Sequence, residues 1–243
     1  MKIMLDAGHG YNTPGKRSPD GLREYEYNRA VANYAKQLLE NYKNVTVYFS
    51  HSDQQDVSLT ARTDKANSLN VDIFVSIHAN AFGSGGWNNV GGIETYVYPS
   101  RPPVANQLAQ KIQRNLTVAT GLENRGVRTA DFHVLRETKM DAVLIEGGFM
   151  TNRNEVELLR SETYRRTIAE GIVKALAEQF KLQRKDNAAP VPAPPTSSAK
   201  SAAAARKSGL YKVQAGAFED ERNAEDLAAR LKKAGFDAYI VQE

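Results

Sequence analysis

The sequence predicts an α/β protein with a mostly parallel, twisted sheet flanked by helices, and a small C-terminal βαβ repeat after a linker rich in proline and alanine. Three observations lead to this prediction. Strand and helix patterns alternate over the first 180 residues, the composition changes abruptly near residue 187, and a short strand–helix–strand pattern follows residue 209. A chain of 243 residues has room for one full domain and a small second one.

The expected sheet is built from short apolar runs of the kind found in strands that are buried on both faces. Stretches with helical periodicity lie between them, and this alternation favours a parallel sheet with helices on its faces. The expected strands are Lys2–Asp6, Val45–Phe49, Asp72–His78, Ile93–Tyr98 and Ala142–Gly147, and the expected helices lie near Glu24–Tyr42, Leu59–Asn70, Val104–Ala119 and Tyr164–Phe180.

Composition and charge exclude several classes of function. The chain has no cysteine, so a metal site must use nitrogen and oxygen ligands. The net charge is +4, yet residues 181–208 alone carry +5. The basic charge therefore belongs to the linker and not to a folded face, which argues against a nucleic-acid partner. Neither a signal-type leader nor a membrane-spanning run is visible, so we expect synthesis in the cytoplasm without a signal peptide and no membrane insertion.

Glu24 is an informative carboxylate because of its helical phase. The apolar stripe of its helix includes Tyr27 and Val31, and continuing the stripe backwards reaches Glu24. Glu26 instead aligns with Arg29 on the solvent face. A carboxylate on the inner face needs a cation or several donors to offset its desolvation. The alternative interpretation is an ordinary N-terminal glutamate stabilised by the helix macrodipole.

Polar side chains also follow three of the expected strands. His9 lies between two glycines after the first strand, and His78 and Glu146 each end an apolar strand. Ligands of open α/β sheets bind at the carboxyl edge of the strands, so these groups are expected to meet there. Two histidines and a carboxylate form a catalytic zinc set with one open position.

Other polar residues fit alternative sites less well. His51 and His133 have no evident ligand context and are expected to be structural or adjacent to the substrate. A serine hydrolase is disfavoured because no serine occupies a Gly-x-Ser-x-Gly turn. The stretch GSGGWNNVGG at Gly83–Gly92 has no phosphate-loop lysine and is interpreted as a flexible loop beside the site.

The motifs LDAGHG, GLREYEYN, SIHANA and AVLIEGGFMTN occur in this order over residues 1–182. In this respect the chain resembles the zinc-dependent N-acetylmuramoyl-L-alanine amidases, which include cell-wall autolysins and phage endolysins. The resemblance implies one Zn²⁺ held by His9, Glu24 and His78, with Glu146 as the second catalytic carboxylate. It also implies that peptidoglycan is the partner, cleaved between N-acetylmuramic acid and the L-alanine of the stem peptide. Glu137 is the nearest alternative to Glu146.

Two other classes of function stay open alongside the amidase. One is a zinc carboxypeptidase or deacetylase acting on the same polymer, and the other is a non-catalytic wall-binding protein. No substrate-contacting residue is predicted. Without a leader, the enzyme is expected to reach the wall through a holin or on cell lysis, as a phage endolysin or a sporulation autolysin does.

The C-terminal segment is expected to form a partial wall-binding module. Residues 183–208 are the expected linker, and residues 209–243 contain YKVQAGAF followed by a helical stripe. This segment resembles the first half of a SPOR-type peptidoglycan-binding domain, which is built from two such repeats. A single repeat leaves a strand edge unpaired, so we expect two chains to form a homodimer through residues 209–243.

Overall fold

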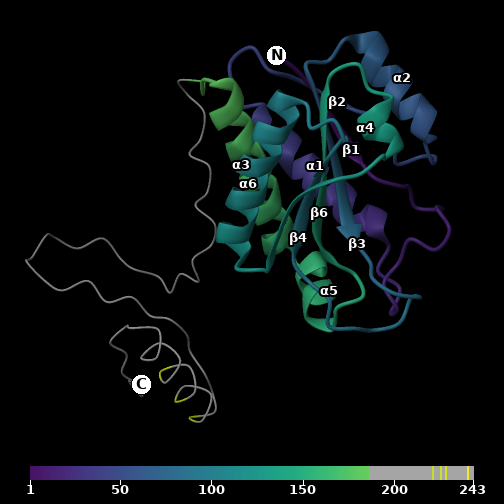
Figure 1. Ribbon diagram of the computed structural model, residues 1–243, viewed down its shortest axis with the longest axis vertical. Helices are drawn as coiled ribbons and strands as arrows, with labels where there is room; N and C mark the ends of the chain where they lie inside the picture. The colour runs from purple at the N-terminus through teal and green to yellow at the C-terminus, as the bar shows by residue number, and fades with distance from the viewer. Residues whose placement is uncertain (186–220, 222–224, 226–227, 229–239, 241–243) are drawn as a thin grey trace, which may run out of the picture. The chain divides into compact units, whose positions relative to one another are not determined.

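The computed structural model describes residues 1–185 and the single residues 221, 225, 228 and 240 (Figure 1). The chain divides into two units, residues 1–197 and 198–243. Most of the expected linker at 183–208 and nearly all of the expected repeat at 209–243 lie outside the described residues. The fold and the site below therefore concern the first unit.

A six-stranded sheet forms the centre of this unit, in the order β2–β1–β3–β6–β4–β5. All neighbouring strands are parallel except β4 and β6, which are antiparallel. The mostly parallel sheet predicted from the sequence is thus confirmed. The strands are β1 Lys2–Ala7, β2 Thr46–Phe49, β3 Ile73–Asn80, β4 Ile93–Val97, β5 Asn124–Thr129 and β6 Asp141–Phe149.

Helices cover both faces of the sheet (Figure 1). Helices α1, α3 and α6 pack together on one face over the larger apolar core, and α2 and α4 lie over a smaller core on the other face. None of the helices in the described part of the chain is both long and apolar enough to cross a membrane. The helices are α1 Glu24–Leu39, α2 Leu59–Leu69, α3 Pro103–Thr120, α4 His133–Arg136, α5 Arg153–Arg160 and α6 Glu162–Phe180.

The helix ends have local chemical causes. The side chains of Ser58, Asn152 and Ser161 accept hydrogen bonds from the first free backbone N–H groups of α2, α5 and α6. Helix α3 is followed by Gly121, which caps its C-terminus in a left-handed conformation with φ of 69°. Helix α1 has no such side-chain cap, and Glu24 and Glu26 lie in its first turn.

The structure contains three elements that periodicity did not predict, namely β5, α4 and α5. Strand β5 is an edge strand with no fully buried residue, and its sequence NRGVRT contains no apolar run. Helix α4 has only 4 residues and α5 only 8, which is too short for a clear helical stripe. The other elements end within a few residues of their expected bounds.

The described chain continues briefly beyond α6 along the first domain. The backbone N–H of Lys43 donates to the carbonyl of Gln183 at 2.8 Å, and that of Lys185 donates to the carbonyl of Asn41 at 2.8 Å. Residues 183–185 therefore lie against the segment that connects α1 to β2.

Candidate metal centre

The predicted site residues meet at the carboxyl edge of the sheet. His9 follows β1 by two residues, His78 lies near the end of β3, and Glu146 is its register partner on β6. Because β1, β3 and β6 are neighbouring parallel strands, their ends share one edge. Glu24 reaches the same point from the first residue of α1.

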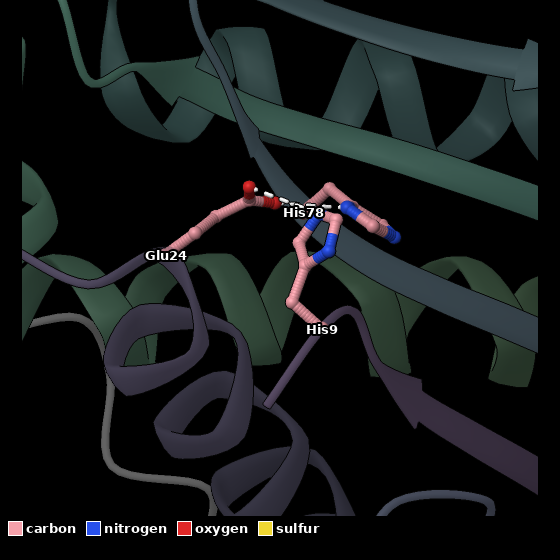
Figure 2. A group of neighbouring side chains, drawn as sticks. All are labelled: His9, Glu24 and His78. Atoms are coloured by element: carbon pink, nitrogen blue, oxygen red, sulfur yellow. Dashed lines mark hydrogen bonds and ion pairs between the residues drawn. The ribbon is translucent and has the colours of Figure 1, made fainter. Parts of the chain in front are cut away.

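The Glu24 carboxylate points toward both imidazole rings, which lie side by side (Figure 2). Its Oε1 is 2.8 Å from Nδ1 of His78, and its Oε2 is 3.1 Å from Nε2 of His9. One candidate ligand atom from each of the three residues can be chosen so that all lie within 4.8 Å of one another. Two imidazole nitrogens and a carboxylate oxygen at this spacing can hold one metal ion, and they are donors that Zn²⁺ accepts.

The backbone before His9 is shaped to admit the second histidine. A Cβ atom on Gly8 would lie 2.0 Å from Cε1 of His78, so only glycine allows the imidazole to pack against this turn. His9 itself has a φ of 65°, a left-handed conformation that is uncommon for a residue with a side chain. The turn after β1 therefore requires glycine at position 8 and a left-handed backbone at position 9.

Asn28 supports the Glu24 carboxylate and was missed by sequence reasoning. Its Nδ2 donates to Oε1 of Glu24 at 3.2 Å and to the carbonyl of Gly8 at 3.0 Å. The backbone N–H of Ala79 donates to the same Oε1 at 3.2 Å. Its spacing could have predicted this contact, because Asn28 follows Glu24 by four residues and therefore lies on the inner stripe of α1.

The charge states of Glu24 and His78 follow from their contacts. Burial alone would raise the pKa of Glu24, but hydrogen bonds with His78 and His9 outweigh it and hold the pKa well below its usual range. Burial opposes the charge on His78, yet the hydrogen bond with Glu24 raises its pKa to about 8. Glu24 is thus ionised at neutral pH and attracts positive charge, whether protons or a metal ion, to this point.

Glu146 differs from Glu24 because one of its carboxyl oxygens has no partner. Oε2 of Glu146 is buried and makes no hydrogen bond to any described residue. Burial raises the pKa of this carboxyl to about 8; His78 opposes the rise, and Glu24 and Glu94 add to it. A buried carboxyl oxygen left unpaired beside a ligand set is typical of a group that acts on a substrate or a water.

Glu94 lies opposite Glu146 on β4 and shows the contrasting case. Its carboxylate is 2.6 Å from Nε of Arg125, and it accepts hydrogen bonds from Tyr96 at 2.5 Å and Asn80 at 3.1 Å. Two neighbouring carboxylates therefore have opposite environments: Glu94 is fully paired, and Glu146 is not. This difference in hydrogen bonding indicates different roles for the two carboxylates.

A cavity of about 400 Å³ is lined by the three candidate ligands and by Glu146. Its rim combines exposed apolar side chains with a cation, since Leu59 is 55% exposed, Phe132 is 39% exposed and Lys16 lines the same cavity. These residues were not predicted from the sequence, because they come from separate loops and helix ends. A cavity of this size accommodates a small organic group.

The remaining histidines and Glu137 lie outside the ligand set. His51 accepts a hydrogen bond from the backbone N–H of Ala7 at 3.1 Å, and burial lowers its pKa to about 4, so it is a neutral structural residue. His133 lines the cavity near Thr63. Glu137 pairs with Arg136 at 2.7 Å and is not part of the cavity wall.

Together, the open α/β sheet, the three converging ligands and the unpaired carboxylate define a candidate metallohydrolase with a single metal site. Comparison with known proteins identifies the kind of hydrolase. Residues 3–178 match the family model of the N-acetylmuramoyl-L-alanine amidases. The chain belongs to this family, which confirms the amidase and the peptidoglycan hydrolase predicted from the motifs.

Individual relatives cover most of the chain. The N-acetylmuramoyl-L-alanine amidase CwlM of Bacillus licheniformis is 37% identical over 242 residues, which are 99% of this chain and 85% of the relative. A sporulation-specific N-acetylmuramoyl-L-alanine amidase of Bacillus subtilis is 35% identical, with 99% and 84% covered. The solved catalytic domain of CwlV, an amidase from Bacillus (Paenibacillus) polymyxa var. colistinus, has a TM-score of 0.69 at 32% identity and covers 75% of this chain and 99% of its own.

The C-terminal segment matches a second family model. Residues 207–243 match the SPOR domain, which confirms the resemblance noted in the sequence. Four of these residues are described in the structure, at positions 221, 225, 228 and 240.

Proposed function

We propose that this protein hydrolyses the amide bond between N-acetylmuramic acid and L-alanine in peptidoglycan, with one Zn²⁺ held by His9, Glu24 and His78. The observation that carries the proposal is the convergence of three ligand atoms within 4.8 Å beside the unpaired carboxyl oxygen of Glu146. Membership of the amidase family supports the choice of bond.

The residues present fit a zinc ion. All three donors are nitrogen or oxygen atoms of the kinds that Zn²⁺ takes, and they come from two separate strand ends and a helix. Oε1 of Glu24 already accepts hydrogen bonds from Asn28 and Ala79, whereas His9 is the one partner of Oε2 among the described residues. When bound, Zn²⁺ would polarise the scissile carbonyl and lower the pKa of a coordinated water to about 7.

Glu146 is the proton carrier in this proposal. Its free Oε2 accepts a proton from the attacking water while the water oxygen bonds to the amide carbon. The carboxylic acid then donates that proton to the amide nitrogen as the carbon–nitrogen bond breaks. The raised pKa of Glu146 suits this role, because the group must both take and release a proton near neutral pH.

The proposed organisation assigns residues 1–182 to the catalytic domain, 183–208 to a linker and 209–243 to a wall-binding repeat. The two family matches, over residues 3–178 and 207–243, support separate catalytic and binding parts. In the same proposal two chains pair through their C-terminal repeats and engage the wall as a homodimer. A second attachment raises the effective concentration of each domain at the polymer.

Mass spectrometry of digested cell wall tests the reaction. An amidase releases intact stem peptides from uncut glycan, a carboxypeptidase shortens the stems, and a deacetylase releases acetate. His9→Ala and His78→Ala should lose zinc, measured by elemental analysis, together with lytic activity, while circular dichroism stays unchanged. Full zinc content in either variant contradicts the ligand assignment. Wall binding without any chelator-sensitive loss of turbidity would favour the non-catalytic alternative.

A further inference from the structure

Arg62 is a buried cation on α2 that lies under the turn carrying His9. It is 2% exposed and its Nη1 is 2.7 Å from Oδ1 of Asp6, which is itself 1% exposed. Ser50 and Ser76 also donate hydrogen bonds to this carboxylate, and Ser76 does so at 2.6 Å. Asp6 thus has several fixed donors, and the guanidinium that pairs with it is held in one orientation.

The guanidinium also binds the backbone on both sides of Gly8. Nη1 of Arg62 donates to the carbonyl of Ala7 at 2.6 Å, and Nη2 donates to the carbonyl of His9 at 2.5 Å. Its Nε donates to the carbonyl of Val57 at 2.9 Å. All three guanidinium nitrogens therefore have partners, and two of the acceptors belong to the turn that presents His9.

The rest of this turn is held by other fixed donors and acceptors. The N–H of Gly8 donates to the carbonyl of Ile77 at 3.0 Å, and the carbonyl of Gly8 accepts from Asn28. Because β1 ends at Ala7, the carbonyl of His9 lies beyond the strand ladder, and Arg62 supplies it with a donor. That carbonyl belongs to the residue with a φ of 65°.

We propose that Arg62 is a positioning residue of the metal centre: by binding the carbonyls of Ala7 and His9 together, it fixes the left-handed backbone of His9 and thereby aims the imidazole at the ligand position. This inference rests on the proposed function, because it concerns retention of the metal. The planar guanidinium supplies several donors in a fixed fork, whereas the ammonium of lysine is a point charge and cannot serve these acceptors in the same geometry.

A purely structural role for Arg62 makes a different prediction. A buried ion pair that only stabilises the fold should change the stability of the protein and leave the metal affinity of the folded state unchanged. A positioning role should weaken metal binding even where the variant is fully folded. Partners that orient metal ligands typically change affinity by about 10–100-fold when they are removed.

The experiment compares Arg62→Lys and Arg62→Met with the control Ile172→Ala in the full chain. Ile172 is fully buried on α6 and is not part of the cavity, so its truncation lowers stability without touching the His9 turn. Zinc affinity is measured by competition with a chromophoric chelator at a temperature where all variants are folded. Hydrogen exchange of the backbone amides of residues 7–10 is measured on the zinc-free proteins.

We expect both Arg62 variants to bind zinc about 10–100-fold more weakly and to exchange faster at residues 7–10, while Ile172→Ala matches the unmodified protein in both measurements. If Arg62→Met does not fold, Arg62→Lys retains the positive charge beside Asp6 and supplies both measurements. Unchanged zinc affinity in Arg62→Lys, or an equal loss in Ile172→Ala, overturns the inference.

Failure of the proposed metal centre is distinguishable from failure of this inference. If the unmodified protein binds no zinc, the proposed metal site is refuted, and the positioning role of Arg62 is refuted with it whatever the exchange data show. If the unmodified protein binds zinc and exchange at residues 7–10 is unchanged in the Arg62 variants, the metal centre stands and the positioning role is wrong.

Discussion

At the scale of single residues, the two carboxylates Glu24 and Glu146 differ in their hydrogen-bond partners. Oε1 of Glu24 accepts from Asn28 and Ala79 and lies 2.8 Å from His78, whereas Oε2 of Glu146 has no partner among the described residues. A carboxylate held by several donors is suited to a fixed ligand role. An unpaired one is free to exchange a proton with whatever occupies the cavity.

Glu146→Gln tests the proton-transfer role. The amide keeps the volume of the side chain but cannot take up a proton near neutral pH, so turnover should fall by about 10²–10⁴, the usual contribution of a general acid–base group. Zinc should remain bound, because Glu146 is not one of the three proposed ligands. Steady-state kinetics on purified wall and elemental analysis measure the two effects. Activity within a factor of a few of the unmodified enzyme would mean that another group moves the proton.

Asp6→Asn tests the buried ion pair with Arg62. Removing one partner leaves a buried charge uncompensated, so the free energy of unfolding at pH 7 should drop by about 3–5 kcal/mol. Urea denaturation at pH 7 measures this loss. A loss below about 1 kcal/mol would show that water or another group compensates Arg62.

The same pair should contribute to the pH dependence of stability. Burial opposes the charge on Asp6, but Arg62, Ser50 and Ser76 outweigh it and lower the pKa. A lowered pKa stabilises the folded state above the unfolded pKa of about 3.9, and this contribution is lost as the pH falls below it. The unmodified protein should therefore lose more stability on acidification than Asp6→Asn. Parallel curves of unfolding free energy against pH would refute this.

At the scale of elements, the phase of α1 decides which glutamate reaches the site. Glu24 is 3% exposed and Glu26 is partly exposed, as the apolar stripe predicted. Glu24→Gln places an N–H₂ group where two donors and two imidazoles already point, so metal retention should weaken. Glu26→Gln should retain zinc. Parallel chelator competition on the two variants measures the difference, and zinc loss in Glu26→Gln alone would shift the ligand assignment by two residues.

At the scale of the whole molecule, the proposed dimer predicts a concentration-dependent mass. Sedimentation of the full chain should approach a dimer at high concentration, and a chain ending at Lys185 should stay monomeric. Lys185 is the appropriate end because residues 183–185 bond to the backbone near residues 41–43. Monomers in both cases would exclude pairing through residues 209–243.

Local patterns in the sequence were sufficient to predict most of the secondary structure and the convergence of the site residues. Five of the six strands and the four longest helices were expected near their observed bounds, because apolar runs and helical periodicity depend on residues that are close in the chain. The convergence of His9, His78 and Glu146 followed from one rule, that the ends of neighbouring parallel strands share an edge. The inward phase of Glu24 followed from the helical repeat.

Contacts between distant segments were decided only by the tertiary structure. Arg62 binds the carbonyl of a residue 53 positions earlier, and Asn28 binds the carbonyl of Gly8, 20 positions earlier; no local pattern relates either pair. The sequence also could not show that Glu94 is paired while Glu146 is not, because both are carboxylates in apolar strands. Their difference arises from which side chains the sheet order places beside each of them, and that order is a property of the packed fold.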